Sequence, residues 1–259
     1  MEYLKTHDVK DTKDMKVLVV GGGDGYVVNE LLKYSKIEVI DHVELDEEVI
    51  NVSKKHLPWG AAWKDSRVNL IIEDGAKFVK EQAESGHTYD VIIQDSSDPE
   101  WEEEDGSITT LPSSVLYEKS HFDNLYKLLE PKSGVFMMQA ETYNIPSNIQ
   151  SIKKWRKLLL DSGFATARYG SIAIPTYPTG QIGFFAAHIG TTDSEECKSS
   201  DNDVCHDKSV SWEMNWNHAV TQYSEHANTL QYYHPGVHRA SYDLPLWIHR
   251  YIYDEDPKH

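Results

Sequence analysis

An apolar segment that runs directly into a group of glycines constrains the fold more than any other feature of this sequence. Residues 17–20 read Val-Leu-Val-Val, residues 21–25 read Gly-Gly-Gly-Asp-Gly, and residues 27–32 have the apolar spacing of a helix. A short unbroken apolar run is typical of a strand buried on both faces, as in parallel sheets covered by helices. The segment therefore predicts a strand, a tight turn and a helix, which together form the basic unit of an α/β fold.

The same alternation continues along the chain. We expect strands at residues 16–20, 38–43, 68–72, 91–94 and 135–139. We expect helices that start near Tyr26, Asp46, Gly75, Ser114 and Asn148. Two aromatic-rich apolar runs, 165–175 and 181–189, flank a Thr-Tyr-Pro-Thr-Gly turn and predict a β-hairpin. The predicted fold class is therefore α/β, with a mostly parallel sheet and an antiparallel hairpin at one edge.

The rest of the chain divides by composition. Residues 190–209 are polar, contain Cys197 and Cys205, and are expected to form an exposed loop. Residues 212–233 and 244–251 are expected to be helices joined by His234-Pro235-Gly236. We expect residues 1–14 to be a leader or remnant and residues 15–259 to form one domain. The two cysteines need not pair, and such sparse use favours a reducing cytoplasm.

Charge and hydropathy narrow the classes of partner. The chain has 25 Lys and Arg against 42 Asp and Glu, a formal net charge of −17. This charge repels phosphate and favours cations, so nucleic acid and membrane surfaces are not expected as partners. No apolar run approaches the roughly 20 residues of a membrane span. The N-terminus lacks a basic end followed by an apolar run, so we expect no secretory signal and a cytoplasmic location.

The glycine turn indicates a nucleoside site. Gly21, Gly23 and Gly25 allow the backbone to approach a ligand closely, and Glu44 ends the next expected strand, where an acid commonly binds ribose hydroxyls. Asp24 lies where the pyrophosphate of a dinucleotide would lie, and its charge would repel phosphate. A cationic adenosyl sulfonium with an amine tail fits better. Asp74 follows the third expected strand and either binds the adenine amino group or forms an Asp-Gly turn.

A pair of acids follows the fourth expected strand. Asp95 and Asp98 lie at its carboxyl end, where α/β sheets bind ligands, although Asp-Ser-Ser-Asp-Pro is also a turn sequence. Freeing the lone pair of an amine with a lysine-like pKa costs roughly 4–5 kcal/mol at pH 7. Asp95 is the candidate base for that proton, and Asp98 the anchor for a distal ammonium. Tyr177 either places a hydroxyl beside the amine, as a second candidate catalytic and substrate-binding residue, or is a packed hairpin aromatic.

The order and spacing of these motifs carry a resemblance over most of residues 15–250. The matching blocks are 21–25, Glu44, 73–75, 95–99, 139–141, 174–184 and 232–240. They resemble the spermidine synthase (polyamine aminopropyltransferase) family. The resemblance implies a methyltransferase-like Rossmann fold with decarboxylated S-adenosylmethionine as co-substrate and putrescine or a related amine as acceptor, giving spermidine and methylthioadenosine.

The resemblance also implies residue roles. Asp24 would bind the aminopropyl amine, Glu44 the ribose and Asp74 the adenine. Asp95 would bind the attacking amine as its base, and Asp98 and Tyr177 would bind the polyamine. No metal site is expected.

Departures from the family pattern keep two alternatives open. Family members usually begin with a small β domain that contributes to dimers and substrate binding, and we expect it to be absent here, which leaves a homodimer open. Tyr26 replaces a usual glycine. Residues 100–114 form an acidic insert that either attracts a longer polycation such as spermidine or is simply exposed and solvated. The alternatives are a putrescine N-methyltransferase that uses S-adenosylmethionine and a non-catalytic polyamine-binding relative.

Overall fold

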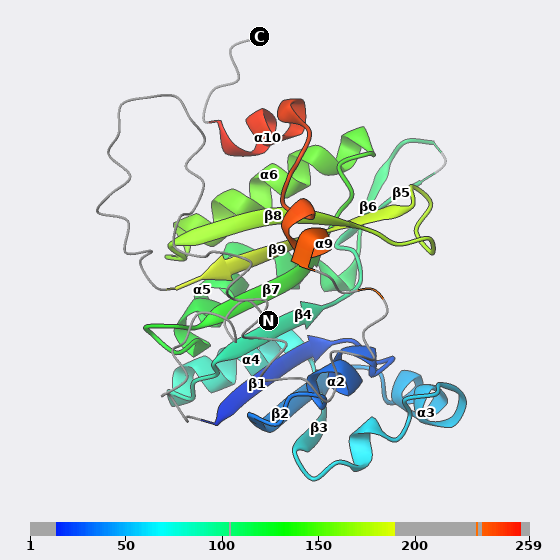
Figure 1. Cartoon of the computed structure of the whole chain (residues 1–259), viewed down its shortest axis with the longest axis vertical. Helices are drawn as coiled ribbons and strands as arrows, with labels where there is room; N and C mark the ends of the chain where they lie inside the picture. Colours follow the sequence, from blue (N-terminus) through cyan, green and yellow to red (C-terminus); the bar gives the residue numbers. More distant parts are fainter. Residues whose placement is uncertain (1–13, 104, 190–231, 233–234, 255–259) are drawn as a thin grey trace.

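The computed structural model describes residues 14–103, 105–189, 232 and 235–254 (Figure 1). The strands are β1 (Met15–Gly21), β2 (Ile37–Glu44), β3 (Val68–Ile72), β4 (Val91–Asp95), β5 (Glu100–Glu102), β6 (Ile108–Thr110), β7 (Val135–Ala140), β8 (Thr166–Ala173) and β9 (Gln181–His188). The α-helices are α2 (Tyr26–Leu31), α3 (Glu47–His56), α4 (Gly75–Ser85), α5 (Lys119–Leu128), α6 (Pro146–Asp161), α9 (Pro235–Ala240) and α10 (Leu246–Tyr253). Short 3-10 helices are η1 (Ala62–Lys64) and η2 (Pro112–Tyr117).

Seven of the described strands form one sheet in the order β3-β2-β1-β4-β7-β9-β8, and β5 and β6 form a separate two-stranded sheet. The strands from β3 to β7 in this order are parallel to their neighbours, whereas β9 is antiparallel to both β7 and β8. The sequence prediction of a mostly parallel sheet with an antiparallel edge hairpin is therefore confirmed.

The central strand β1 shows why its apolar run is unbroken. Val17 and Val19 belong to one hydrophobic cluster, which contains residues of α2, and Leu18 and Val20 belong to another, which contains residues of α4, α5 and α6. These helices cover opposite faces of the sheet, and α10 packs beside α6 (Figure 1). Full burial of a Val or Leu side chain contributes about 1.5–3 kcal/mol relative to exposure. Burial on both faces thus fixes β1 at the centre of the sheet.

The parallel register brings several chemically active strand ends to one edge. Gly21 of β1 pairs with Asp95 of β4, and Glu44 is the last residue of β2 beside them. Because parallel strands point the same way, the loops after β1, β2, β4 and β7 meet at this carboxyl edge.

Two local sequence predictions are wrong, and a third was incomplete. Ser114 lies within the 3-10 helix η2 and the α-helix starts later, at Lys119, because the Pro112 ring is accommodated at the start of the shorter helix. The acidic insert is largely exposed, as predicted, and within it β5 and β6 pair as an antiparallel hairpin that the sequence did not predict. Pro235 and Gly236 are not a joint between helices but the first residues of α9, a position that proline tolerates because no N–H is needed there.

Some predictions lie outside the described residues. These are the leader over residues 1–13, the loop at 190–209 with both cysteines, and most of the helix expected at 212–233. Within the described part of the chain, no helix has the length and apolar content required to cross a bilayer.

Candidate active site

The glycine turn after β1 adopts a backbone that only glycine tolerates well. Gly21, Gly22 and Gly25 have φ values of 79°, 69° and 77°. A Cβ on Gly21 would lie 2.2 Å from the carbonyl oxygen of Asp95. The Gly22 N–H donates to that same carbonyl at 2.7 Å. These glycines therefore allow the turn to lie directly against the end of β4.

Two further acids border the turn. A Cβ on Gly23 would lie 2.8 Å from Oε2 of Glu44, and the other oxygen of Glu44 accepts from the Asp46 N–H at 2.9 Å. Asp24 is exposed, and its Oδ1 accepts from the Tyr26 N–H at 2.9 Å. The Glu44 carboxylate is thus fixed beside the glycine backbone, with Asp24 at the mouth of the turn.

Asp95 experiences the charge of both of these acids. Its side chain is partly buried, and this burial, followed by the negative charges of Asp24 and Glu44, raises its pKa. Three carboxylates that the sequence placed on separate loops therefore interact in the folded protein. A carboxylate with a raised pKa is a stronger proton acceptor than an ordinary aspartate.

Asp98 and Glu141 form a second carboxylate pair, whose charges act together with that of Asp95 on the hydroxyls of Tyr117 and Tyr177. Asp98 is exposed as a residue, yet its carboxyl group shares a hydrogen bond with Glu141, and partial burial raises its pKa. Burial, followed by the charge of Asp98, raises the pKa of Glu141 to about 7. The side-chain amide of Asn148 donates to Oε2 of Glu141 at 2.7 Å. The pair can therefore hold a proton or, when both are ionised, attract a cation.

Tyr177 faces these acids from the β8–β9 hairpin. Burial, followed by the charges of Asp98 and Asp95, raises the pKa of its hydroxyl. Its oxygen accepts a hydrogen bond from the Gln139 side chain at 2.9 Å. Tyr177 is therefore not only a packed hairpin aromatic, because its hydroxyl is held among the acidic side chains. We refer to Asp24, Glu44, Asp95, Asp98 and Glu141 as the carboxylate cluster.

Asp74 lies outside this set of interacting acids. It is exposed at the end of β3 and caps α4, where its Oδ1 accepts from the Lys77 N–H at 3.0 Å. Capping satisfies one of the free N–H groups of a helix N-terminus. The structure thus shows the structural role of Asp74, and its adenine contact stays a prediction.

Sequence reasoning assigned no role to Glu141, nor to Tyr117, which supports the loop of residues 96–99 after β4. Glu141 directly follows β7, so the rule that located Asp95 at the end of β4 would also have located it. The loop is held by Tyr117, whose hydroxyl accepts from Ser96 Oγ and donates to the Ser97 carbonyl, both at 3.2 Å. No sequence signal pointed to this support, since it joins segments about twenty residues apart through side chains.

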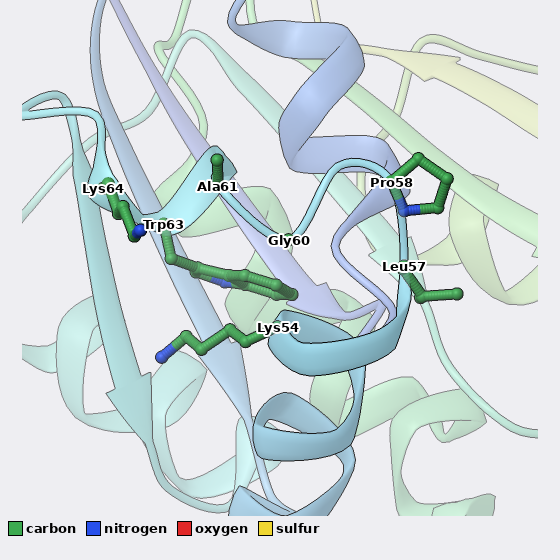
Figure 2. A pocket seen from close by; sticks show the side chains of 7 residues that line it. All are labelled: Lys54, Leu57, Pro58, Gly60, Ala61, Trp63 and Lys64. Atoms are coloured by element: carbon green, nitrogen blue, oxygen red, sulfur yellow. The ribbon is translucent and has the colours of Figure 1, made fainter.

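A separate pocket borders the Trp63 ring, against which Gly25 of the glycine turn also packs. It has a volume of about 430 Å³ and is lined by Lys54, Trp63, Lys64 and neighbouring residues of the α3–η1 connection (Figure 2). Trp63 forms its wall, with Lys54 Nζ 5.5 Å from the ring centre. None of the predicted site residues lines it. Across the described ranges, no group of three or more His, Cys, Asp or Glu side chains is arranged to hold a metal ion.

Comparisons with known proteins match this chain to enzymes that act on polyamines. The family described as "Spermine/spermidine synthase domain" matches residues 5–195. Putrescine N-methyltransferase 1 of Nicotiana tabacum is 36% identical over 242 residues, which cover 92% of this chain and 56% of that protein. Spermidine synthase 2 of Arabidopsis thaliana is 34% identical over 246 residues, covering 92% of this chain and 62% of that protein. The chain thus spans less than two thirds of the length of either relative.

Solved structures agree with the sequence comparisons. A spermidine synthase in complex with the transition state analogue AdoDATO is 26% identical, with a TM-score of 0.71 over 92% of this chain and 69% of that chain. The spermidine synthase from Thermotoga maritima is 25% identical, with a TM-score of 0.70 over 93% of this chain and 69% of that chain. The similarity therefore extends through nearly the whole described fold.

Proposed function

This chain belongs to the spermine/spermidine synthase family, as its sequence blocks predicted, and from this premise we propose that it transfers an aminopropyl group from decarboxylated S-adenosylmethionine to putrescine or a related amine. With putrescine, the products are spermidine and methylthioadenosine. The observation that carries the proposal is the carboxylate cluster, in which Asp95 interacts with Asp24 and Glu44 on one side and with Tyr177, beside Asp98, on the other.

The donor is proposed to bind along the glycine turn. Glu44 would accept hydrogen bonds from the ribose hydroxyls through the carboxylate that faces Gly23. Asp24, at the mouth of the turn, would attract the ammonium of the aminopropyl chain. Asp74, at the end of β3, would accept from the adenine amino group. Decarboxylation of the donor removes the one negative charge that Asp24 would repel.

The transfer itself needs a free amine lone pair and an acceptor for its proton. The nitrogen attacks the carbon beside the sulfonium, the C–S bond breaks with its electrons going to sulfur, and a neutral thioether leaves. Asp95 would take the proton that the ammonium gives up. The raised pKa of Asp95 brings it closer to the pKa of the ammonium, which makes the proton transfer less unfavourable. Displacing water around the amine lowers the ammonium pKa and contributes to the same end.

The distal end of the amine is proposed to lie at Asp98 and Glu141. Without bound amine these two carboxylates share a proton. A bound ammonium ionises both of them, because the cation favours their charged forms. Tyr177 would accept a hydrogen bond from the same amine while Gln139 holds its hydroxyl in place.

Transfer of a methyl group to putrescine is the second candidate function. The sequence comparisons support this candidate, since a putrescine N-methyltransferase is as similar to this chain as a spermidine synthase is. Methyl transfer requires S-adenosylmethionine, whose retained carboxylate would approach Asp24. That repulsion is the reason for ranking aminopropyl transfer first.

Product analysis tests the proposal. The protein is incubated with putrescine and either decarboxylated S-adenosylmethionine or S-adenosylmethionine, and products are identified by mass spectrometry. Spermidine with methylthioadenosine supports aminopropyl transfer, whereas N-methylputrescine with S-adenosylhomocysteine supports the second candidate. A folded protein that binds both substrates and gives no product would support a non-catalytic polyamine-binding relative and would refute both. The Asp95→Asn variant serves as the control for background chemistry.

A further inference from the structure

A fully buried histidine lies beneath the glycine turn. His42, on β2, has no exposed surface, and its Nε2 lies 2.8 Å from the carbonyl oxygen of Gly21. Its other ring nitrogen, Nδ1, accepts a hydrogen bond from the indole N–H of Trp63 at 2.9 Å. An indole N–H can only donate, so Nδ1 carries no proton and Nε2 must carry it. The histidine is therefore fixed as the Nε2–H tautomer, which donates to Gly21.

This bond acts on a peptide group that is also held at its other end. The Gly21 carbonyl and the Gly22 N–H belong to one planar peptide unit, in which they point in opposite directions. The Gly22 N–H donates to the carbonyl of Asp95 at 2.7 Å, on the side away from His42. Both flanking glycines have positive φ, and glycine offers little resistance to rotation. The two hydrogen bonds therefore determine the orientation of this peptide.

The orientation of this peptide matters for Asp95. A Cβ on Gly22 would lie 3.2 Å from Oδ2 of Asp95, so the turn packs directly against this carboxylate. If the peptide rotated, its carbonyl oxygen would face the carbonyl of Asp95, and two acceptors would oppose each other. The wall against which the Asp95 carboxylate packs would then change shape.

We propose that His42, held in one tautomer by Trp63, is a positioning residue that fixes the Gly21–Gly22 peptide for donor binding and for the placement of Asp95. This inference rests on the proposed function of the carboxylate cluster. It assigns a role to the wall of the Trp63 pocket, because the Trp63 ring edge also lies against Gly25, where a Cβ would approach it to 2.3 Å.

The arrangement implies a dependence on pH. Burial lowers the pKa of His42 despite the nearby negative charges of Glu44 and Asp24, and the positive charge of Lys54 acts in the same direction as burial. Protonation would place a hydrogen on Nδ1, facing the N–H of Trp63, so two donors would oppose each other. The hydrogen bond from Trp63 is therefore lost as the pH falls through the lowered pKa of His42, whereas the protonated ring still donates from Nε2 to Gly21.

Substitutions separate the two hydrogen bonds. His42→Leu removes the donor to Gly21, and His42→Gln keeps an N–H that can reach the same carbonyl. Trp63→Phe keeps an aromatic ring but removes the bond to Nδ1, so the pKa of His42 rises. Trp247→Phe, at an exposed position of α10, is the control for loss of an indole N–H elsewhere.

The first measurement is the affinity for methylthioadenosine by calorimetry from pH 5.5 to 8. We expect His42→Leu to weaken binding about tenfold, the size expected when one hydrogen bond of about 1.4 kcal/mol is lost. We expect His42→Gln to restore most of this loss. Trp63→Phe, which removes the donor that opposes the protonated Nδ1, should flatten the acid limb of the pH profile, and Trp247→Phe should not. Unchanged binding by His42→Leu, or an acid limb that is as steep in Trp63→Phe as in the unaltered protein, would overturn the proposal.

The second measurement does not depend on a ligand. In protein labelled with ¹⁵N-histidine, we expect His42 to show only the Nε2–H tautomer at pH 8 and a mixture in Trp63→Phe. The Gly22 amide should exchange with solvent faster in His42→Leu than in His42→Gln. A mixed tautomer in the unaltered protein, or equal Gly22 exchange in the two variants, would refute the positioning role. If methylthioadenosine fails to bind while these signatures hold, the proposed function fails and the hydrogen-bond chain stands.

Discussion

The proton shared by Asp98 and Glu141 leads to a quantitative prediction about amine binding. Because the pKa of Glu141 is raised to about 7, roughly half of the protein molecules hold a proton there at pH 7. An ammonium bound at this pair favours the ionised form and expels that proton. Binding of putrescine at pH 7 should therefore release up to about half a proton per protein molecule from this group.

The same reasoning gives the change in affinity. Below pH 7 the amine competes with the proton, and above pH 7 the pair is already ionised. The apparent affinity for putrescine should rise about tenfold between pH 6 and pH 8, which corresponds to about 1.4 kcal/mol. Glu141→Gln removes the titrating group, so this variant should bind more weakly at pH 8 and show a flatter pH dependence.

Calorimetry in buffers of different ionisation enthalpy measures both quantities. Glu48→Gln, which removes an exposed carboxylate on α3, is the matched control and should behave like the unaltered protein. Binding that takes up protons at pH 7, or a Glu141→Gln variant with an unchanged pH dependence, would refute the assignment of a shared proton to this pair.

Three further predictions concern the turn, the donor and the core. Gly21→Ala should lower the free energy of unfolding by more than Gly86→Ala, because both glycines have positive φ but only a Cβ at Gly21 meets another atom, the Asp95 carbonyl oxygen at 2.2 Å. The control variant, Gly86→Ala, should lose about 1–2 kcal/mol. Equal losses of the two variants in chemical denaturation would contradict the packing argument. Asp24→Asn should weaken binding of decarboxylated S-adenosylmethionine about tenfold in calorimetry without weakening binding of S-adenosylmethionine. An equal effect on both donors would exclude selection of the donor by the charge of Asp24. Burial lowers the pKa of His121 from 6.5 to about 4. Between these pH values the unfolded state binds more protons than the folded state, so the free energy of unfolding decreases as the pH falls, and His121→Leu should lose about 3 kcal/mol less than the unaltered protein. Parallel pH profiles of stability for the two proteins would contradict this role of His121.

Local patterns were sufficient to predict the sheet and the strand-end residues. The buried run before Gly21 and the acids at the ends of β2 and β4 obey rules that depend only on nearby residues and on the parallel arrangement. The structure places Glu44 and Asp95 beside the turn as that arrangement requires. Their roles toward substrates stay predictions.

The features that sequence reasoning missed depend on contacts between distant segments. The tautomer of His42 is set by Trp63, and the pKa of Glu141 is raised by burial and by Asp98, none of which is visible in a local pattern. The hairpin of β5 and β6 was missed because its strands are only three residues long and its composition is that of a solvated acidic loop.

A crystal structure of the protein with methylthioadenosine and putrescine would test most directly whether the carboxylate cluster forms a single site. We expect the ribose hydroxyls on Glu44, one nitrogen of putrescine at Asp95, and the other between Asp98 and Glu141. Methylthioadenosine or putrescine bound elsewhere, for example in the pocket beside Trp63, would contradict the proposed site.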